Sequence, residues 1–352
     1  MAANLTLDTR ETLQSAAIYA LNTDIEIMLW CEKEKFPPLE LLAQIWFERI
    51  EKQFSRFRTD SELTYINTSK GKQTSISDLM LEVLLLAEKY QQMTHGIFNP
   101  LILNALESTG YDTSFEKLGN KNRDLVKLPQ SEYSMASSSL DQSNHCASSS
   151  PGITLTITLD PTAHSLQLPA EAEIDLGGIV KSWAVKRLAQ KYKHELKIKR
   201  GFVNAGGDLY AWGNSSETGE PWLIGVEDPW QPSQDIGIIA LETGSVATSS
   251  KLGRQWLTAQ GPMHHLIDPR TMRPSISDTV QCTITGPDVI ECEIWTKVIC
   301  ILGLNKGLEL FAQNTSGYEA LLFTKNKETY FYGEKSSLGK LWRDLKAPYF
   351  NF

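Results

Sequence analysis

The chain has 352 residues, of which 41% are hydrophobic and 22% are charged. That length is enough for one large domain or two closely joined lobes, and the composition is that of an ordinary globular protein with a sizeable core. The formal net charge of -8 at pH 7 argues against a general nucleic-acid binder, because such proteins need a basic surface to displace counterions from phosphates.

The cysteines and the hydropathy of the sequence exclude further classes of protein. The five cysteines are odd in number and form no C-x-x-C pair, which argues against a disulfide framework or a zinc site. Residues 1–14 are polar and lack the apolar core of a signal peptide. No stretch approaches the roughly 20 apolar residues of a membrane span. We therefore expect a cytoplasmic protein without a membrane span.

The first predicted elements are one strand and two helices. Residues 24–30 alternate in period two, as in a half-buried strand. Apolar residues recur at helical spacing over 38–57, after two prolines that suit a helix start. Residues 78–93 are predicted to form a second helix, with Ser77 as its N-cap.

A serine-rich segment at 131–152 separates these elements from the rest of the chain. It has no apolar periodicity, so we predict a flexible insertion or linker. Residues 153–160 and 164–168 then predict a hairpin, and 174–192 predict a strand end, a glycine turn and a helix. Short strands are expected at 201–212, 222–226, 236–242, 264–268 and 279–285.

The last predicted elements are two helices and a hairpin. A helix over 288–302 would end at Gly303, which suits the C-terminal cap position. Asn305 is expected to cap a further helix through Asn314, and 318–332 predict a final hairpin. Because the elements do not alternate regularly, we predict an α+β fold. We expect one domain over 1–325, with 326–352 as a C-terminal hairpin or tail.

Three glycine or proline turns carry the polar residues of most interest. Asp175 to Lys181 reads DLGGIVK, in which a glycine turn before a helix suits an anion such as a diphosphate. Asn204 to Asp208 reads NAGGD, and His265 to Thr271 reads HLIDPRT, in which a His, an Asp and an Arg surround a rigid turn. Taken singly, the first and third segments are equally compatible with an ordinary structural turn, and the second favours such a turn.

Together these segments resemble the flavin transferase family called ApbE, over about residues 20–325. The similarity includes Ser55-Arg56-Phe57, 60–63 with Asn67, and 94–100, where Asn99 stands at an Asp of the family. Segments 221–229 and 247–249 match as well, and all of them follow the family's order. Such a collinear series is hard to obtain by chance, although each match alone is weak.

The resemblance implies a two-lobed fold of mixed and antiparallel sheets flanked by helices, with FAD bound between segments. It also implies an activity, the transfer of FMN from FAD to a Ser or Thr hydroxyl of an acceptor protein with release of AMP. The alternatives are a FAD-binding protein without transferase activity and a FAD pyrophosphatase that uses water. The sequence does not identify the acceptor protein.

The resemblance also implies roles for individual residues. His265 and Asp268 fall at catalytic positions, with His265 helping to deprotonate the incoming hydroxyl. The FAD-contacting positions are held by Phe57, Asp175, Gly177, Lys181, Thr248 and Ile267.

The expected Mg²⁺ site is where this chain departs from the family. Gly178 falls at a position that offers a backbone carbonyl, Glu293 at an Asp ligand, and Lys297 at a Thr ligand, with Thr296 just before it. An ammonium has no lone pair to give a metal. Lys297 either takes the place of the cation or forms only an i,i+4 helix pair with Glu293. Other departures are Ser182 for Gly, Lys186 for Asp and Met272 for Gly.

Overall fold

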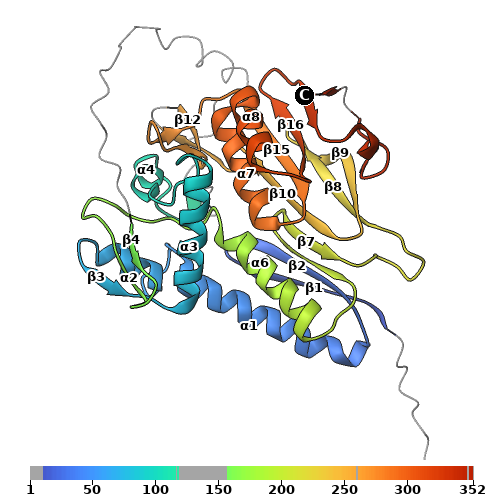
Figure 1. Ribbon diagram of the computed structural model, residues 1–352, viewed down its shortest axis with the longest axis horizontal. Coiled ribbons are helices and arrows are strands. Elements are labelled where there is room, and N and C mark those ends of the chain that lie inside the picture. The colour runs from blue at the N-terminus through green and yellow to red at the C-terminus, as the bar shows by residue number, and fades with distance from the viewer. Residues whose placement is uncertain (1–10, 116, 119–156, 259–260, 347–348, 352) are drawn as a thin grey trace, which may run out of the picture.

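The computed structural model describes residues 11–115, 117–118, 157–258, 261–346 and 349–351 (Figure 1). The serine-rich segment 131–152 and the start of the hairpin predicted at 153–160 lie outside these residues. No helix in the described part of the chain combines the length and apolar character needed to cross a membrane.

A large sheet forms the centre of the molecule. Within the described residues it has nine strands, in the order β1-β2-β6-β7-β10-β15-β16-β17-β19, antiparallel except for the pair β17 and β19. The strands are β1 (Thr12–Ala20), β2 (Thr23–Cys31), β6 (Gly201–Ala205), β7 (Asp208–Trp212), β10 (Gly244–Ser250), β15 (Thr279–Gly286), β16 (Glu319–Thr324), β17 (Thr329–Tyr332) and β19 (Tyr349–Asn351).

Helices cover one face of this sheet. In Figure 1, α1 and α6 lie over its first strands, and α7 and α8 over its later ones. Alternation along β2 explains the packing, because Ile25, Ile27 and Leu29 point toward the helices and are fully buried. The helices are α1 (Phe36–Phe54), α2 (Glu62–Thr68), α3 (Asp78–Met93), α4 (Leu103–Ser108), α6 (Val180–Gln190), α7 (Val289–Leu302) and α8 (Leu304–Asn314), with short turns η1 (Lys33–Lys35), η3 (Lys191–Glu195) and η4 (Lys335–Ser337).

A small sheet covers the other face. It consists of β8 (Trp222–Asp228), β9 (Gln231–Leu241) and β18 (Trp342–Arg343), and it packs through Trp222 and Ile239 against residues of the large sheet such as Phe202. The layers are therefore helices, large sheet and small sheet, which confirms the α+β class. The remaining ribbons are β3 (Gln73–Ser75) with β5 (Ser165–Gln167) and β4 (Thr158–Asp160), β11 (Gln255–Thr258) with β12 (Gly261–His264), and β13 (Ile267–Asp268) with β14 (Arg273–Pro274).

Several predicted elements are confirmed in place. The strand predicted at 24–30 is β2, and the helix predicted at 78–93 is α3, whose N-cap Ser77 accepts a hydrogen bond from the Met80 amide. The helix predicted over 38–57 is α1, which starts at Phe36 and contains both prolines in its first turn. The helix α7 ends at Gly303, whose φ of 88° suits glycine.

Other predictions were wrong, and tertiary contacts explain why. Asn305 does not cap α8, because it lies inside the helix, whose first amide, that of Leu304, donates to the Asp278 carboxylate at 2.9 Å. The strand predicted at 264–268 is broken between β12 and β13, and 201–212 form two strands joined by a turn. The edge strand β1 was missed, since half of its side chains face solvent.

The C-terminal segment packs closely against the large sheet. The Glu319 carboxylate on β16 is buried, and it accepts hydrogen bonds from the Trp342 indole and the Ser337 hydroxyl. These contacts join β18 and η4 to the start of β16.

A tight turn follows β13 and ends in a strained residue. The Asp268 carbonyl accepts from the amides of Thr271 and Met272 at 3.1 and 2.8 Å. The φ of Met272 is 54°, in the left-handed region that favours glycine, and the residue is 40% exposed. The packing of the side chain therefore does not account for its conformation.

We predict that Met272→Gly raises the free energy of unfolding by about 0.5–1 kcal/mol in denaturant titrations. Relief of left-handed strain is worth about 1–2 kcal/mol, and the added freedom of glycine in the unfolded chain offsets roughly 0.5–1 kcal/mol of that gain. Arg273, its exposed neighbour on β14, is outside the left-handed region, so Arg273→Gly should lower stability. A loss of stability in both variants would contradict this account of the turn.

Candidate functional site

A cavity of about 570 Å³ lies where α6, β7, β10 and α7 meet the loop that leads to β13. Volumes of this order are typical of small-molecule sites. All but two of the site residues predicted from the sequence line it, which brings together segments far apart in the chain. These lining residues are Phe57, Asp175, Gly177, Gly178, Lys181, Thr248, His265, Ile267, Glu293 and Lys297.

The two exceptions, Asp268 and Thr296, are held elsewhere. Both oxygens of the Asp268 carboxylate accept from the Arg270 guanidinium, at 2.9 and 2.7 Å, and this contact holds the pKa of Asp268 down despite the opposing effect of burial. Asp268 therefore fixes the turn rather than facing the cavity. Thr296 is fully buried and points toward β10, where its hydroxyl lies 2.8 Å from that of Ser249.

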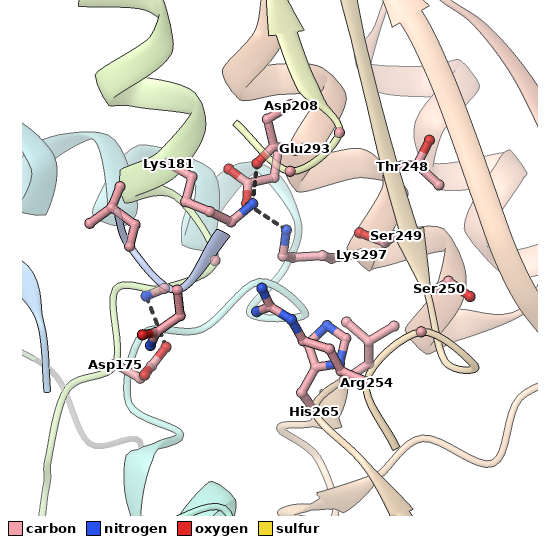
Figure 2. A pocket seen from close by; sticks show the side chains of 18 of the residues that line it. Asp175, Lys181, Asp208, Thr248, Ser249, Ser250, Arg254, His265, Glu293 and Lys297 are labelled. Atoms are coloured by element: carbon pink, nitrogen blue, oxygen red, sulfur yellow. Dashed lines mark hydrogen bonds and ion pairs between the residues drawn. The ribbon is translucent and has the colours of Figure 1, made fainter. Parts of the chain in front are cut away.

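Four charged side chains form a buried cluster at one end of the cavity (Figure 2). Lys181 lies in the first turn of α6 and forms an ion pair with Asp208 at the start of β7. Glu293 and Lys297 lie one turn apart on α7, and their Oε1 and Nζ atoms are 2.8 Å apart. Lys181 Nζ also lies 3.7 Å from the same Glu293 oxygen.

Burial and mutual attraction set the charges of this cluster. Desolvation raises the pKa of Asp208 to about 6, the charge of Glu293 adds to the rise, and Lys181 opposes it. Burial alone would raise the pKa of Glu293, but Lys297 and Lys181 together hold it below its ordinary value. At neutral pH the cluster therefore contains ionised carboxylates paired with ammonium groups.

The described residues do not fit a Mg²⁺ ion at this position. Glu293 Oε1 is taken by Lys297 and Lys181, and Oε2 accepts from the Ser182 hydroxyl. A Cβ atom placed on Gly178 would lie 3.5 Å from Lys297 Cε, so the lysine stem covers that backbone. Nowhere in the described part of the chain do three or more His, Cys, Asp or Glu side chains gather as metal ligands. Mg²⁺ demands several free oxygen ligands in near-octahedral geometry.

The glycine turn before α6 forms part of the cavity wall, and several polar contacts fix its position. Asp175 Oδ1 accepts from the Gly177 amide at 2.9 Å, and Asp175 Oδ2 pairs with Arg56 Nε at 3.0 Å. The Asp175 amide donates to the Pro100 carbonyl, which fixes the turn to the loop after α3. The start of α6 thus faces the cavity with its positive dipole end, which suits an anion.

Aromatic side chains line another part of the cavity. The Arg56 guanidinium lies 4.1 Å from the centre of the Phe57 ring and 4.6 Å from that of Tyr111. Tyr111 in turn packs on Trp256 with ring centres 5.1 Å apart. The sequence did not single out Arg56 or Tyr111 as site residues, although Arg56 stands in a matching segment.

His265 and Arg254 complete the cavity, as Figure 2 shows. Burial, followed by the nearby charges of Arg254 and Lys297, holds the pKa of His265 well below its ordinary value. The imidazole is therefore neutral at neutral pH, and among the described residues its buried Nδ1 atom has no hydrogen-bond partner. Arg254 was missed because it lies in none of the recognised segments, and only the folded chain brings it to the site.

The chain is similar in sequence to several named proteins. A protein of Klebsiella pneumoniae named FAD:protein FMN transferase is 29% identical over 175 residues, which is 49% of this chain and 52% of that protein. The chain thus spans about half the length of this relative. A second Klebsiella pneumoniae protein of that name is 21% identical over 87% of this chain and 85% of its own length. A Haemophilus influenzae protein with the same name is 24% identical over 79% and 76%.

Solved structures share the fold. The ApbE protein of Thermotoga maritima superposes with a TM-score of 0.72 at 23% identity, over 90% of this chain and 96% of that one. The flavin transferase ApbE of Vibrio cholerae gives 0.69 at 20% identity, over 92% and 98%. The sequence model of the ApbE family matches residues 21–322. This match covers most of the sequence, and the chain belongs to the ApbE family.

Proposed function

We propose that this protein is a FAD-dependent protein FMN transferase, which moves FMN from FAD to a Ser or Thr hydroxyl of an acceptor protein. One observation carries the proposal. A single cavity contains an aromatic wall at Phe57, a glycine turn at the start of α6 and a group of cationic side chains. These are the surfaces that a flavin ring and a diphosphate require. The names of the relatives agree with this assignment.

The reaction forms one phosphorus–oxygen bond and breaks another. The acceptor hydroxyl oxygen attacks the phosphorus on the FMN side of the diphosphate. The bond from that phosphorus to the bridging oxygen breaks, and its electron pair leaves on the phosphate of AMP. The hydroxyl proton must pass to a base. Because charge accumulates on phosphoryl oxygens, positioning and electrostatic stabilisation supply most of the catalysis.

The chain's own residues account for binding and orientation. The start of α6, with Lys181 in its first turn, faces the space that suits a diphosphate. Arg254 lines the same cavity and lies beside His265 in Figure 2. Phe57 offers an aromatic surface for the flavin ring, and the Arg56 guanidinium, whose side chain is 6% exposed, packs on the Phe57 ring. Asp268 supports this arrangement from outside by fixing the turn after Ile267.

His265 is the proposed proton acceptor. It lines the cavity, and its lowered pKa keeps the ring in the neutral form that accepts a proton. The binding of an anionic diphosphate beside it would raise this pKa toward neutrality, because a negative charge stabilises the imidazolium. The base therefore strengthens when the substrate is present.

This mechanism does not use the Mg²⁺ ion that the resemblance implies, because both carboxylate oxygens of Glu293 already accept from Ser182 and Lys297. The two other candidate functions use the same cavity. A FAD-binding protein would hold the ligand unchanged, and a FAD pyrophosphatase would use water in place of the acceptor hydroxyl.

We predict that FAD binds about tenfold or more tightly than FMN in calorimetric titrations. The AMP half adds a second phosphate, and hydrogen bonds to charged groups contribute about 1.5–3 kcal/mol each. Lys181→Met should reduce this preference, while Lys186→Met, on the same helix but outside the cavity, should leave it unchanged. Equal affinities for FAD and FMN would show that the cavity does not recognise a diphosphate.

Incubation with FAD and a candidate acceptor protein separates the three functions. We expect AMP and covalently bound flavin in equal amounts, because transfer produces one of each. AMP with free FMN would identify a pyrophosphatase, and the absence of AMP with every acceptor tested would leave a FAD-binding protein. The acceptor with its Ser or Thr replaced by Ala serves as the control.

We predict that His265→Asn lowers the rate of AMP release by about 100-fold, the usual scale of general base catalysis, without changing FAD affinity. In the parent, kcat/KM should hold constant from alkaline pH down to neutrality. It should then fall in acid, as the pH drops below the lowered pKa of His265 and the base becomes protonated. The variant should lack this fall. An unchanged pH profile in the variant would remove His265 from the mechanism.

A further inference from the structure

The position where a metal would be expected is filled by a side chain of this chain. Lys297 extends from α7 across Gly178, and its ammonium lies 2.8 Å from Glu293 Oε1. Its side chain is only 17% exposed, although lysine side chains normally extend into water. The contacts with Gly178 and Glu293 hold its charged end inside the cavity.

A second observation concerns the carboxylate itself. The Ser182 hydroxyl donates to Glu293 Oε2, while the two lysines occupy the surroundings of Oε1. The Glu293 side chain is 1% exposed, so it cannot turn toward solvent to free an oxygen. Glu293 thus accepts hydrogen bonds from ammonium and hydroxyl donors. A metal ligand needs a free oxygen lone pair, and these donors occupy the lone pairs of Glu293.

A third observation is the balance of charge around this end of the cavity. Lys181 and Lys297 are matched by Asp208 and Glu293, whereas Arg254 has no ion pair with a carboxylate in the described part of the chain. These five side chains therefore carry three positive charges against two negative ones and present three cationic groups to a ligand, while the other carboxylates of the lining are Glu51, Asp175, Glu227 and Asp228. The carboxylates hold the ammonium groups in place, as counter-charges do in buried ion pairs.

We infer that Lys297, together with Lys181 and Arg254, replaces the divalent cation at the FAD diphosphate, so that this protein binds FAD and releases AMP without metal. The inference rests on the proposed function. Lys297 would contact the diphosphate oxygens directly and stabilise their charge, while Ser182 and Glu293 position its ammonium. A dication placed beside Glu293 would face the charges of Lys297 and Lys181 at close range.

The test is FAD binding and AMP release in EDTA and in millimolar Mg²⁺. In the parent, we expect both to differ by less than about twofold between the two conditions. Lys297→Met should weaken FAD binding by about tenfold or more in both conditions, the scale of one lost hydrogen bond to a charged group. Lys297→Thr should show a similar loss in EDTA and a recovery of several-fold in Mg²⁺, because the threonine hydroxyl restores an oxygen beside Glu293.

Measuring metal binding directly tests the inference without relying on enzyme activity. Free Mn²⁺, followed by its paramagnetic resonance signal, should be unaffected by the parent and depleted by Lys297→Thr. Lys186→Thr is the matched control, since Lys186 pairs with Asp288 outside the cavity, and it should behave as the parent does. Circular dichroism of each variant checks that it is folded.

Distinct results would overturn the inference and the proposed function. FAD binding or AMP release in the parent that rises about tenfold with Mg²⁺ would overturn the inference alone, and so would depletion of Mn²⁺ by the parent. An unchanged FAD affinity in Lys297→Met would also overturn it, since a cation at the diphosphate cannot be removed without loss. A parent that binds no FAD under either condition would overturn the proposed function, and the inference with it.

Discussion

The burial of charge between α6 and α7 is the constraint on which the site depends. An ionised group taken out of water costs several kcal/mol unless it is paired and hydrogen-bonded. Glu293 is 1% exposed and Asp208 is 3% exposed, so each requires a cation beside it. Lys181 and Lys297 meet this requirement and thereby fix the spacing of the first turn of α6, the start of β7 and the middle of α7.

The rest of the fold brings these three elements together. The order β6-β7-β10 in the large sheet places the start of β7 beneath α6 and next to the strand on which α7 packs. The turn before β7 requires close approach of the backbone, because a Cβ on Gly206 would lie 2.2 Å from the Thr23 hydroxyl on β2. The site therefore depends on strand pairing between the first and middle parts of the chain.

The sequence predicted those parts of the fold that depend on local patterns. Period-two alternation identified β2, and the serine cap and helical spacing identified α3. It could not predict the N-cap of α8, for which it favoured Asn305. The group that accepts from the first amide of α8 is Asp278, 26 residues away in the chain. Nor could it place β1, because an exposed edge strand carries a weak apolar signal.

In the candidate site, too, sequence motifs identified some residues, and only the folded structure identified the others. Motif matches identified most of the lining residues, including Asp175, Lys181 and His265, because they lie in turns whose sequences are distinctive. Thr296 and Lys297 are adjacent on a helix, and alignment alone left both as candidates. Only the packing of α7 decides between them, since it turns Thr296 toward Ser249 and Lys297 toward the cavity.

Three of the departures from the family pattern, at Ser182, Lys186 and Lys297, lie on α6 and α7, which pack against each other. Ser182 donates to one oxygen of Glu293, and Lys297 donates to the other. Lys186, one turn further along α6, pairs with Asp288, the residue that caps α7. A hydroxyl and two ammonium groups thus bind the carboxylates of α7 from both sides. Because Ser182 and Lys297 each donate to the Glu293 oxygen that the other leaves open, we interpret these two replacements as one coupled change, whereas Lys186 binds a separate carboxylate. A substitution at Ser182 or Lys297 alone would leave a buried carboxylate oxygen without a donor, at a cost of about 1–3 kcal/mol, so the two positions should be considered together with Glu293.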